Sequence, residues 1–161
     1  MSELTAQVES LTSGLDEIKP LLPIHYEELS LHRFHGVPLN PQYDIYLQRD
    51  ARGEVVYVTL RELGKLVGYF VGFVAPGLHY QDCLTLLLDI FYVVPEHRGN
   101  GGGLILFNAV KKEAIRRGVQ AWFVGNKEHS KVHATALFEA MKFEKSETYY
   151  CMWLGDQPQE N

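Results

Sequence analysis

A glycine-rich turn near residue 100 constrains the fold more than any other feature of the sequence. Leu84–Val94 is the longest apolar run, and its length and β-branched content are typical of a strand covered on both faces. The turn Pro95–Gly103 follows with four glycines, and the helical periodicity that begins there continues to about Arg117. Glycines allow close backbone approach, and the first turn of a helix has free N–H groups. The arrangement therefore predicts an anion site of the kind that binds phosphate.

Two familiar phosphate-binding patterns do not fit this turn. A Walker loop needs Lys-Ser or Lys-Thr after its glycines, and neither follows Gly103. A dinucleotide-binding fingerprint needs the spacing G-x-G-x-x-G within a βαβαβ series, and the sequence has neither feature here. A purely architectural turn stays open as an alternative, although one or two glycines suffice for such a turn.

The residues of the turn point to a third pattern. Arg98-x-x-Gly101-x-Gly103, preceded by Tyr92-Val93-Val94-Pro95-Glu96-His97, resembles the acetyl-CoA motif of the GCN5-related N-acetyltransferases. The likeness extends over roughly residues 54–153, with the same order of strands and helices around the motif. It implies an α+β fold: a twisted, mostly antiparallel sheet flanked by helices, with a V-shaped split between the strand ending near Val94 and the strand Val119–Val124.

The same resemblance implies acetyl-CoA as co-substrate and assigns residues to it. Pantetheine would lie in the split against the backbone of Phe91, Tyr92 and Val93. The pyrophosphate would take N–H groups of the glycine-rich turn. The implied coenzyme-binding set is Phe91, Tyr92, Val93, Arg98, Gly99, Asn100, Gly101, Gly102, Gly103 and Leu104.

One departure from the family concerns the proton donor. A tyrosine that often protonates the departing CoA thiolate is replaced by Phe138, and phenylalanine donates no proton. Candidate catalytic residues are therefore Asp89, Tyr149 and Tyr150. Asp89 lies inside an apolar strand, where burial is costly unless the carboxylate is paired or faces a wet cleft; a structural role at a strand kink is equally open. One of the two tyrosines faces the cleft side if residues 148–154 form a strand, and ordinary half-buried aromatics are the alternative.

Candidate acceptor-binding residues come from two segments. His25 and Glu28 lie on the first helical stretch, which forms a wall of the acceptor pocket in this family. His79 and Tyr80 belong to a polar, aromatic loop before the central strand. A hydrogen-bonded core histidine, a solvated carboxylate and a plain surface loop are the simpler alternatives. The spacing of the seven histidines predicts no metal site.

The domain organisation follows from the length and the patterns. With 161 residues, we expect one domain over 15–154, between a polar N-terminal arm (1–14, frayed or a short helix) and a polar tail (155–161). The expected helices cover residues 15–31, 43–49, 103–117 and 130–141. Pro20 and Pro23 disturb the first turns of the 15–31 stretch, so its continuous helix should begin near Pro20. The expected strands cover residues 54–60, 66–74, 84–94, 119–124 and 148–154, with a loop at 78–82.

The net charge and the apolar runs exclude several classes of partner and of protein. A net charge of -5 argues against nucleic acid as a partner, and no apolar run is long enough to span a membrane. The first ten residues lack the layout of a secretory signal, so we expect a cytoplasmic protein. The acidic balance favours a cationic acceptor, such as a polyamine, an aminoglycoside, a protein N-terminus or a lysine.

Taken together, we expect an enzyme that moves an acetyl group from acetyl-CoA to a primary amine of a small molecule or a protein. The alternatives are a catalytically impaired CoA-binding interaction module and a phage-encoded modifier of a nucleobase or host protein. The phage reading is prompted by the size and by His25-Tyr26-Glu27-Glu28, which look like small members encoded by tailed phages. Homodimerisation through a strand Tyr149–Leu154 is a further expectation.

Overall fold

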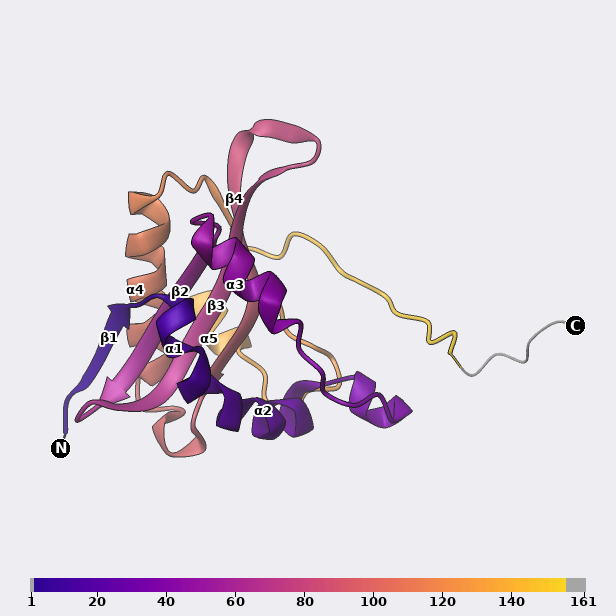
Figure 1. The fold of residues 1–161 in the computed structure, drawn as a ribbon, viewed down its shortest axis with the longest axis horizontal. Coiled ribbons are helices and arrows are strands. Elements are labelled where there is room, and N and C mark those ends of the chain that lie inside the picture. Colours follow the sequence, from indigo (N-terminus) through magenta and orange to yellow (C-terminus); the bar gives the residue numbers. More distant parts are fainter. Residues whose placement is uncertain (1, 156–161) are drawn as a thin grey trace, which may run out of the picture.

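The computed structural model describes residues 2–155, and a twisted sheet forms its centre (Figure 1). Its strands are β1 (Leu4–Val8), β2 (Val55–Glu62), β3 (Lys65–Gly77), β4 (Tyr80–Val93) and β5 (Ala121–Phe123). They lie in the order β1-β2-β3-β4-β5; the first three pairings are antiparallel and β4–β5 is parallel. The mostly antiparallel sheet expected from the sequence is confirmed.

Helices pack on both faces of this sheet. One face carries α1 (Leu11–Ile18), α2 (Leu22–Leu29) and α3 (Tyr43–Ala51), with 3₁₀ turns at Lys19–Leu21 and His32–His35. The other carries α4 (Gly102–Arg116) and α5 (Thr135–Ala140), and a 3₁₀ turn at Pro95–His97 precedes α4. The mixed architecture flanked by helices is therefore also confirmed.

The two faces contain separate hydrophobic cores. Along β2, Tyr57 points to the α1 side, while Val56 and Val58 point to the α4 side, because successive side chains of a strand alternate. Tyr69 and Phe70 divide in the same way on β3. All five side chains are at most 1% exposed. The central strands are thus buried on both faces, as the apolar runs predict.

A β-bulge interrupts the pairing of β3 with β4. Val71 pairs with Ile90 and Gly72 pairs with Leu88, so Asp89 is the extra residue. Gly72 opposite the bulge has no room for a side chain, because a Cβ there would lie 2.7 Å from a methyl of Leu86. The bulge gives Asp89 an orientation that regular alternation does not.

The N-terminal segment differs from the expected frayed arm or short helix. Residues 4–8 form the edge strand β1, which pairs with β2 from Leu4 opposite Glu62 to Val8 opposite Val58. Helix α1 begins at Leu11, so residues 1–14 contain a strand and the start of a helix. The helical stretch expected over 15–31, with its continuous part from near Pro20, forms two helices: the 3₁₀ turn at Lys19–Leu21 separates α1 from α2, which begins at Leu22.

The C-terminal elements are also shorter than expected. The Ser130 hydroxyl donates to the Val132 carbonyl over 2.6 Å instead of capping a helix, and α5 begins only at Thr135. The strand expected over 119–124 is limited to residues 121–123. Residues 148–154 form no strand, and this segment leads away from the sheet (Figure 1).

The loop expected at 78–82 is a tight hairpin connection. β3 continues to Gly77 and β4 begins at Tyr80, so the hairpin projects beyond the rest of the sheet (Figure 1). Among residues 2–155, no helix has both the length and the apolar character that crossing a membrane requires. The same residues contain no cluster of three or more His, Cys, Asp or Glu side chains with metal-binding geometry.

Candidate functional site

The glycine-rich turn positions a set of backbone donors at the start of α4. Gly99 and Gly101 have φ of +78° and +93°, a region that favours glycine. The Ile105 N–H donates to the Gly101 carbonyl over 3.0 Å, which is the first intrahelical bond of α4. The N–H groups of Gly102, Gly103 and Leu104 precede that bond and have no acceptor in the preceding turn of helix. This geometry suits an anionic group.

Close packing explains why further glycines follow Gly101. A Cβ on Gly102 would lie 2.8 Å from the His97 carbonyl oxygen, inside van der Waals contact. A Cβ on Gly103 would lie 3.2 Å from a methyl of Leu137 in the segment of α5. The turn is therefore folded tightly back on itself, and α5 packs against its last glycine.

Arg98 fixes the turn to two other elements. Its Nε donates to the Val93 carbonyl over 2.7 Å, and its Nη2 donates to Glu28 Oε2 over 2.7 Å. The guanidinium also lies 5.3 Å from the centre of the Tyr92 ring. Glu28, expected from the sequence to bind the acceptor, is therefore the ion-pair partner of Arg98.

The split expected between the central strands begins after Leu87. β5 pairs with β4 only at Thr85, Leu86 and Leu87, so the β5-side edge of β4 from Leu88 onward has no strand beside it among the described residues. The Val94 N–H donates to the Val67 carbonyl over 2.9 Å on the β3 side. Because backbone groups alternate along a strand, those of Phe91 and Val93 face the open side.

Aromatic side chains fill the α4 side of the sheet beside this split. Phe107 stacks on Trp122 with 5.3 Å between ring centres, and Phe91 lies edge-on to Phe107 at 5.0 Å. Phe138 lies 6.0 Å from Phe107 and 5.8 Å from Phe143. Position 138 thus belongs to an apolar cluster and contributes no hydroxyl.

Asp89 is held by a residue that the sequence did not single out. The Tyr46 hydroxyl on α3 donates to Asp89 Oδ2 over 2.6 Å. Burial raises the pKa of the Asp89 carboxyl above its usual value, while the Tyr46 hydrogen bond and the charges of Lys127 and Arg49 partly oppose the rise. Burial and the same carboxylate raise the pKa of Tyr46. Asp89 is therefore a half-buried carboxyl with one strong hydrogen-bond donor and two nearby cations.

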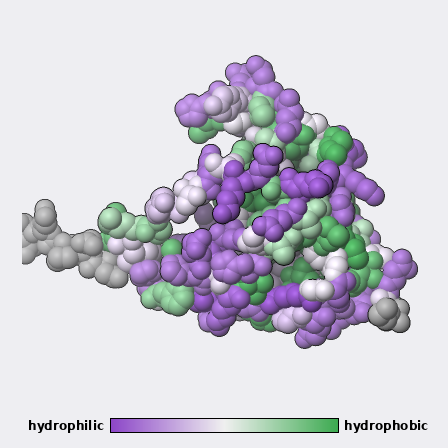
Figure 2. Space-filling model, turned by 180° about the vertical axis from the view of Figure 1, so that it is seen from behind, coloured by the Kyte–Doolittle hydropathy of each residue, from purple (hydrophilic) through white to green (hydrophobic). Residues whose placement is uncertain are grey.

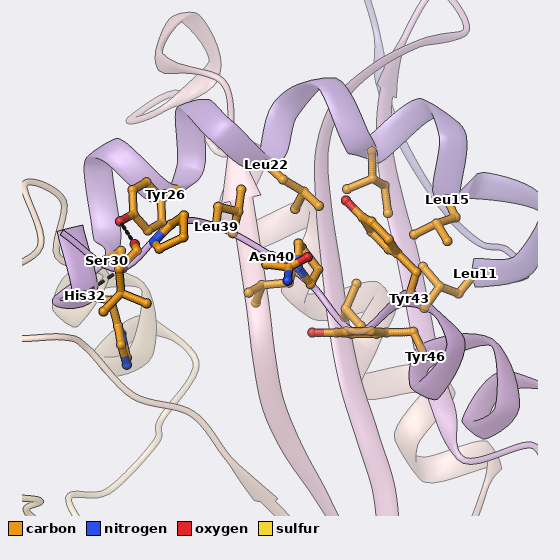
Figure 3. Close-up of a pocket in the computed structure, with 16 residues that line it drawn as sticks. Leu11, Leu15, Leu22, Tyr26, Ser30, His32, Leu39, Asn40, Tyr43 and Tyr46 are labelled. Atoms are coloured by element: carbon orange, nitrogen blue, oxygen red, sulfur yellow. Dashed lines mark hydrogen bonds between the residues drawn. The ribbon is translucent and has the colours of Figure 1, made fainter. Parts of the chain in front are cut away.

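A pocket of about 320 Å³ lies beside this pair (Figure 3). Its walls are α1, α2, α3 and the loop Val37–Pro41, and Val71 and Ile90 of the sheet close it behind. Tyr46 lines the pocket and bonds Asp89, and Ile90 follows Asp89 in the chain. The acid thus stands at the wall between the pocket and the split in the sheet.

The remaining sequence candidates lie elsewhere. His25 is 5% exposed, with its Nδ1 3.1 Å from the Tyr69 hydroxyl and its ring 5.1 Å from that of Tyr92. Burial lowers the pKa of His25 to about 4, so the imidazole is neutral at physiological pH. This is the environment of a hydrogen-bonded core histidine.

His79 and Tyr80 lie at the tip of the projecting hairpin, where their rings are 6.3 Å apart. Nine residues of strand separate Tyr80 from Asp89, a distance of about 30 Å. Tyr149 and Tyr150 are 86% and 94% exposed on the segment that leads away from the body. The structure does not bring these four side chains to Asp89.

Tyr46 could have been found from the sequence only in part. Tyr43 and Tyr46 share one face of the short helix expected at 43–49, which indicates an aromatic contact surface. Nothing local identifies Asp89, 43 residues later, as the partner of Tyr46.

Comparisons with solved structures agree with this architecture. A ribosomal-protein-alanine N-acetyltransferase from Brucella melitensis biovar Abortus 2308 has a TM-score of 0.68 at 18% identity, covering 95% of this chain and 100% of that one. An aminoglycoside acetyltransferase from an uncultured soil metagenomic sample gives 0.71 at 15%, covering 95% and 99%. A predicted acetyltransferase with acetyl-CoA from Clostridium acetobutylicum gives 0.65 at 14%, covering 96% and 99%.

Because these identities are low, the likeness shows a shared fold only. None of the three supports a phage source. No curated protein sequence matches the chain. A model of the acetyltransferase (GNAT) family, however, matches residues 22–143, which include the Tyr46–Asp89 pair, the glycine-rich turn and α5. The chain therefore belongs to the GNAT acetyltransferase family.

Proposed function

We propose that the protein transfers the acetyl group of acetyl-CoA to a primary amine by direct attack in a ternary complex. The observation that carries the proposal is the position of Asp89. It lies on a bulge at the split in the sheet, is bonded to Tyr46, and stands beside a pocket of ligand size.

The residues of the turn fit the coenzyme. The N–H groups of Gly102, Gly103 and Leu104 suit a pyrophosphate, and the outward N–H groups of Phe91 and Val93 with the Phe91 carbonyl suit the amides of pantetheine. Arg98 uses its guanidinium on Glu28 and Val93, so its role is to hold the turn. Acetyl-CoA supplies the acetyl group as a thioester.

Asp89 accounts for the proton that an amine must lose. A carboxyl with a raised pKa is a better proton acceptor than a solvated one, and Tyr46 fixes its orientation. In the balanced reaction an amide C–N bond forms, the thioester C–S bond breaks, the amine proton passes to Asp89 and the sulfur takes a proton. Phe138 cannot supply that last proton, so we propose that it comes from solvent in the open split.

The acceptor is an amine by analogy with two structural neighbours, one named for a ribosomal-protein alanine and the other for aminoglycosides. The alternative candidate is a CoA-binding module without turnover. The absence of a hydroxyl at Phe138, inside the aromatic cluster, is the observation that favours it.

Calorimetric titration of acetyl-CoA tests the coenzyme half of the proposal. Gly101→Glu introduces a carboxylate and a strained φ at the turn. Gly118→Glu carries the same strain, at φ +80°, at the opposite end of α4, and serves as the matched control. We expect micromolar binding that Gly101→Glu loses and Gly118→Glu keeps. No binding by the folded wild-type protein would refute both candidates.

Mass spectrometry of an amine panel then separates the two candidates. Acetylated product that disappears in Asp89→Asn establishes the transferase. Tight acetyl-CoA binding without product from any amine establishes the binding module.

We also propose that two copies associate through the C-terminal segment. Tyr150, Met152 and Leu154 are 94%, 80% and 63% exposed, although they are apolar or aromatic. Seen from behind, hydrophobic side chains are visible on this segment where it approaches the grey atoms (Figure 2). Burying such side chains against a second copy removes apolar surface from water.

A further inference from the structure

The pocket beside Asp89 has an unusual chemical lining for a protein with a net charge of -5. None of its sixteen lining residues is Asp, Glu, Lys or Arg. Figure 3 shows Tyr26 at one end of the pocket and Leu11 and Leu15 at the other, with Leu22 and Leu39 between them. The walls are therefore mostly aliphatic and aromatic, with Ser30, His32 and Asn40 as polar groups, and no acidic residue lines them.

Asp89 is the carboxylate that a hydrogen bond connects to the lining, and it stands at one side of the pocket. Asp89 reaches the lining through the Tyr46 hydroxyl. The charges that act on this carboxylate are the cations Arg49 and Lys127. Glu28 on the neighbouring helix is already paired with Arg98 at 2.7 Å. A second positive charge on a bound ligand would meet no carboxylate among the residues that line the pocket, and near Asp89 it would approach Arg49 and Lys127.

From this lining we infer that the acceptor carries a single amine on a compact apolar body, such as an arylalkylamine, a branched alkylamine or the N-terminal residue of a peptide with such a side chain. The inference rests on the proposed function, since it names the amine that Asp89 would deprotonate. It favours the protein N-terminus among the acceptors expected from the sequence, or a small apolar amine, over a polyamine or an aminoglycoside. The free-energy cost of burying further ammonium groups without partners is much larger than the gain from their contacts with the apolar walls.

Leu39→Asp is the variant that tests the lining. Leu39 lines the pocket and is 41% exposed, so a carboxylate there is tolerated by the fold. Leu78→Asp makes the same change at the hairpin tip, where Leu78 is fully exposed and outside the pocket. The assay compares kcat/KM for 2-phenylethylamine, 3-methylbutylamine, spermidine and kanamycin at saturating acetyl-CoA. A Phe-Ala-Ala peptide is added to the panel to show whether the protein prefers the N-terminus of a peptide to a small free amine.

For the wild-type protein, we expect 2-phenylethylamine or the peptide to exceed spermidine and kanamycin by at least about tenfold in kcat/KM, which corresponds to about 1.4 kcal/mol. Leu39→Asp should reduce that ratio by about tenfold, and Leu78→Asp should leave it unchanged. Preference for spermidine or kanamycin overturns the inference. Equal behaviour of the two variants overturns it as well.

A binding measurement keeps the inference testable if the protein transfers nothing. 2-Phenylethanol has the apolar body without the amine and is titrated by calorimetry into the protein with acetyl-CoA present. Saturable binding that Leu39→Asp weakens supports an apolar pocket even where the transferase proposal fails. No binding by wild-type protein that does bind acetyl-CoA refutes the pocket while leaving the proposed function intact.

Discussion

Replacing Tyr46 by phenylalanine is the perturbation that tests the Asp89 site most directly. The change removes one hydroxyl, which donates to Asp89 Oδ2 over 2.6 Å, and leaves the ring packed beside Phe73 at 5.5 Å between centres. We expect Asp89 to stay in place on its bulge while its carboxylate loses its side-chain donor. Tyr46 then acts as a positioning residue, and its loss changes the protonation of Asp89.

The size of the effect follows from the energy of the bond. A hydrogen bond to an ionised group contributes about 1.5–3 kcal/mol. One pKa unit corresponds to 1.36 kcal/mol, so the pKa of Asp89, already raised by burial, should rise by a further 1–2 units, approximately. The bond stabilises only the ionised form, so its loss moves the pKa upward.

The assay is the pH profile of kcat/KM for acetyl transfer. The ionised carboxyl accepts the amine proton, so the acidic limb of the profile should move to higher pH by the same 1–2 units, approximately, and the alkaline plateau should be kept. Tyr43→Phe is the control, because Tyr43 lies on the same helix and lines the same pocket. An unmoved acidic limb in Tyr46→Phe, or an equal shift in both variants, would refute the role of Asp89 as base.

Three further expectations concern the turn, the helix and the C-terminal segment. Gly102→Ala should lower the free energy of unfolding, measured by urea denaturation, by about 1–3 kcal/mol, because the added Cβ would overlap a backbone oxygen. Gly125→Ala is the control, because the space around Gly125 is open and no such loss of stability is expected. Hydrogen bonds from Arg116 and Arg117 lower the pKa of Glu113 to about 2, so its contribution to stability is complete above about pH 5 and is lost as the pH falls through 2. The destabilisation by Glu113→Gln should therefore be measurable in urea at pH 7 and clearly smaller at pH 2.5. Met152→Asp should weaken self-association by about tenfold in sedimentation equilibrium, and Ile115→Asp, at another exposed apolar site on α4, should not.

The strand, turn and helix around residue 100 were predictable because their signals are local. The apolar run gives the strand, positive φ at Gly99 and Gly101 needs glycine, and the periodicity gives α4. The alternation at 54–60 likewise predicts β2. The split in the sheet was expected from the family resemblance alone, and β4 and β5 pair only at Thr85, Leu86 and Leu87.

Features that depend on distant partners were missed. Leu4–Val8 is short and becomes a strand only through pairing with β2, more than 50 residues later. Tyr149–Leu154 alternates as a strand does but has no neighbouring strand in the described structure, so alternation alone was misleading. The Tyr46–Asp89 pair belongs to the same class, since only the packing of α3 against β4 brings the two side chains together.

The division of the interior into two cores has a consequence for how the protein can diversify. The glycine-rich turn and α4 pack against one face, and the pocket beside Asp89 lies on the other. Substitutions on opposite faces share few neighbours, so their free-energy effects should be nearly additive. The ion pair of Arg98 with Glu28 directly connects the glycine-rich turn to α2, which forms part of the pocket wall. Substitutions in the pocket should therefore change the preference for the proposed acceptor with little effect on the affinity for acetyl-CoA.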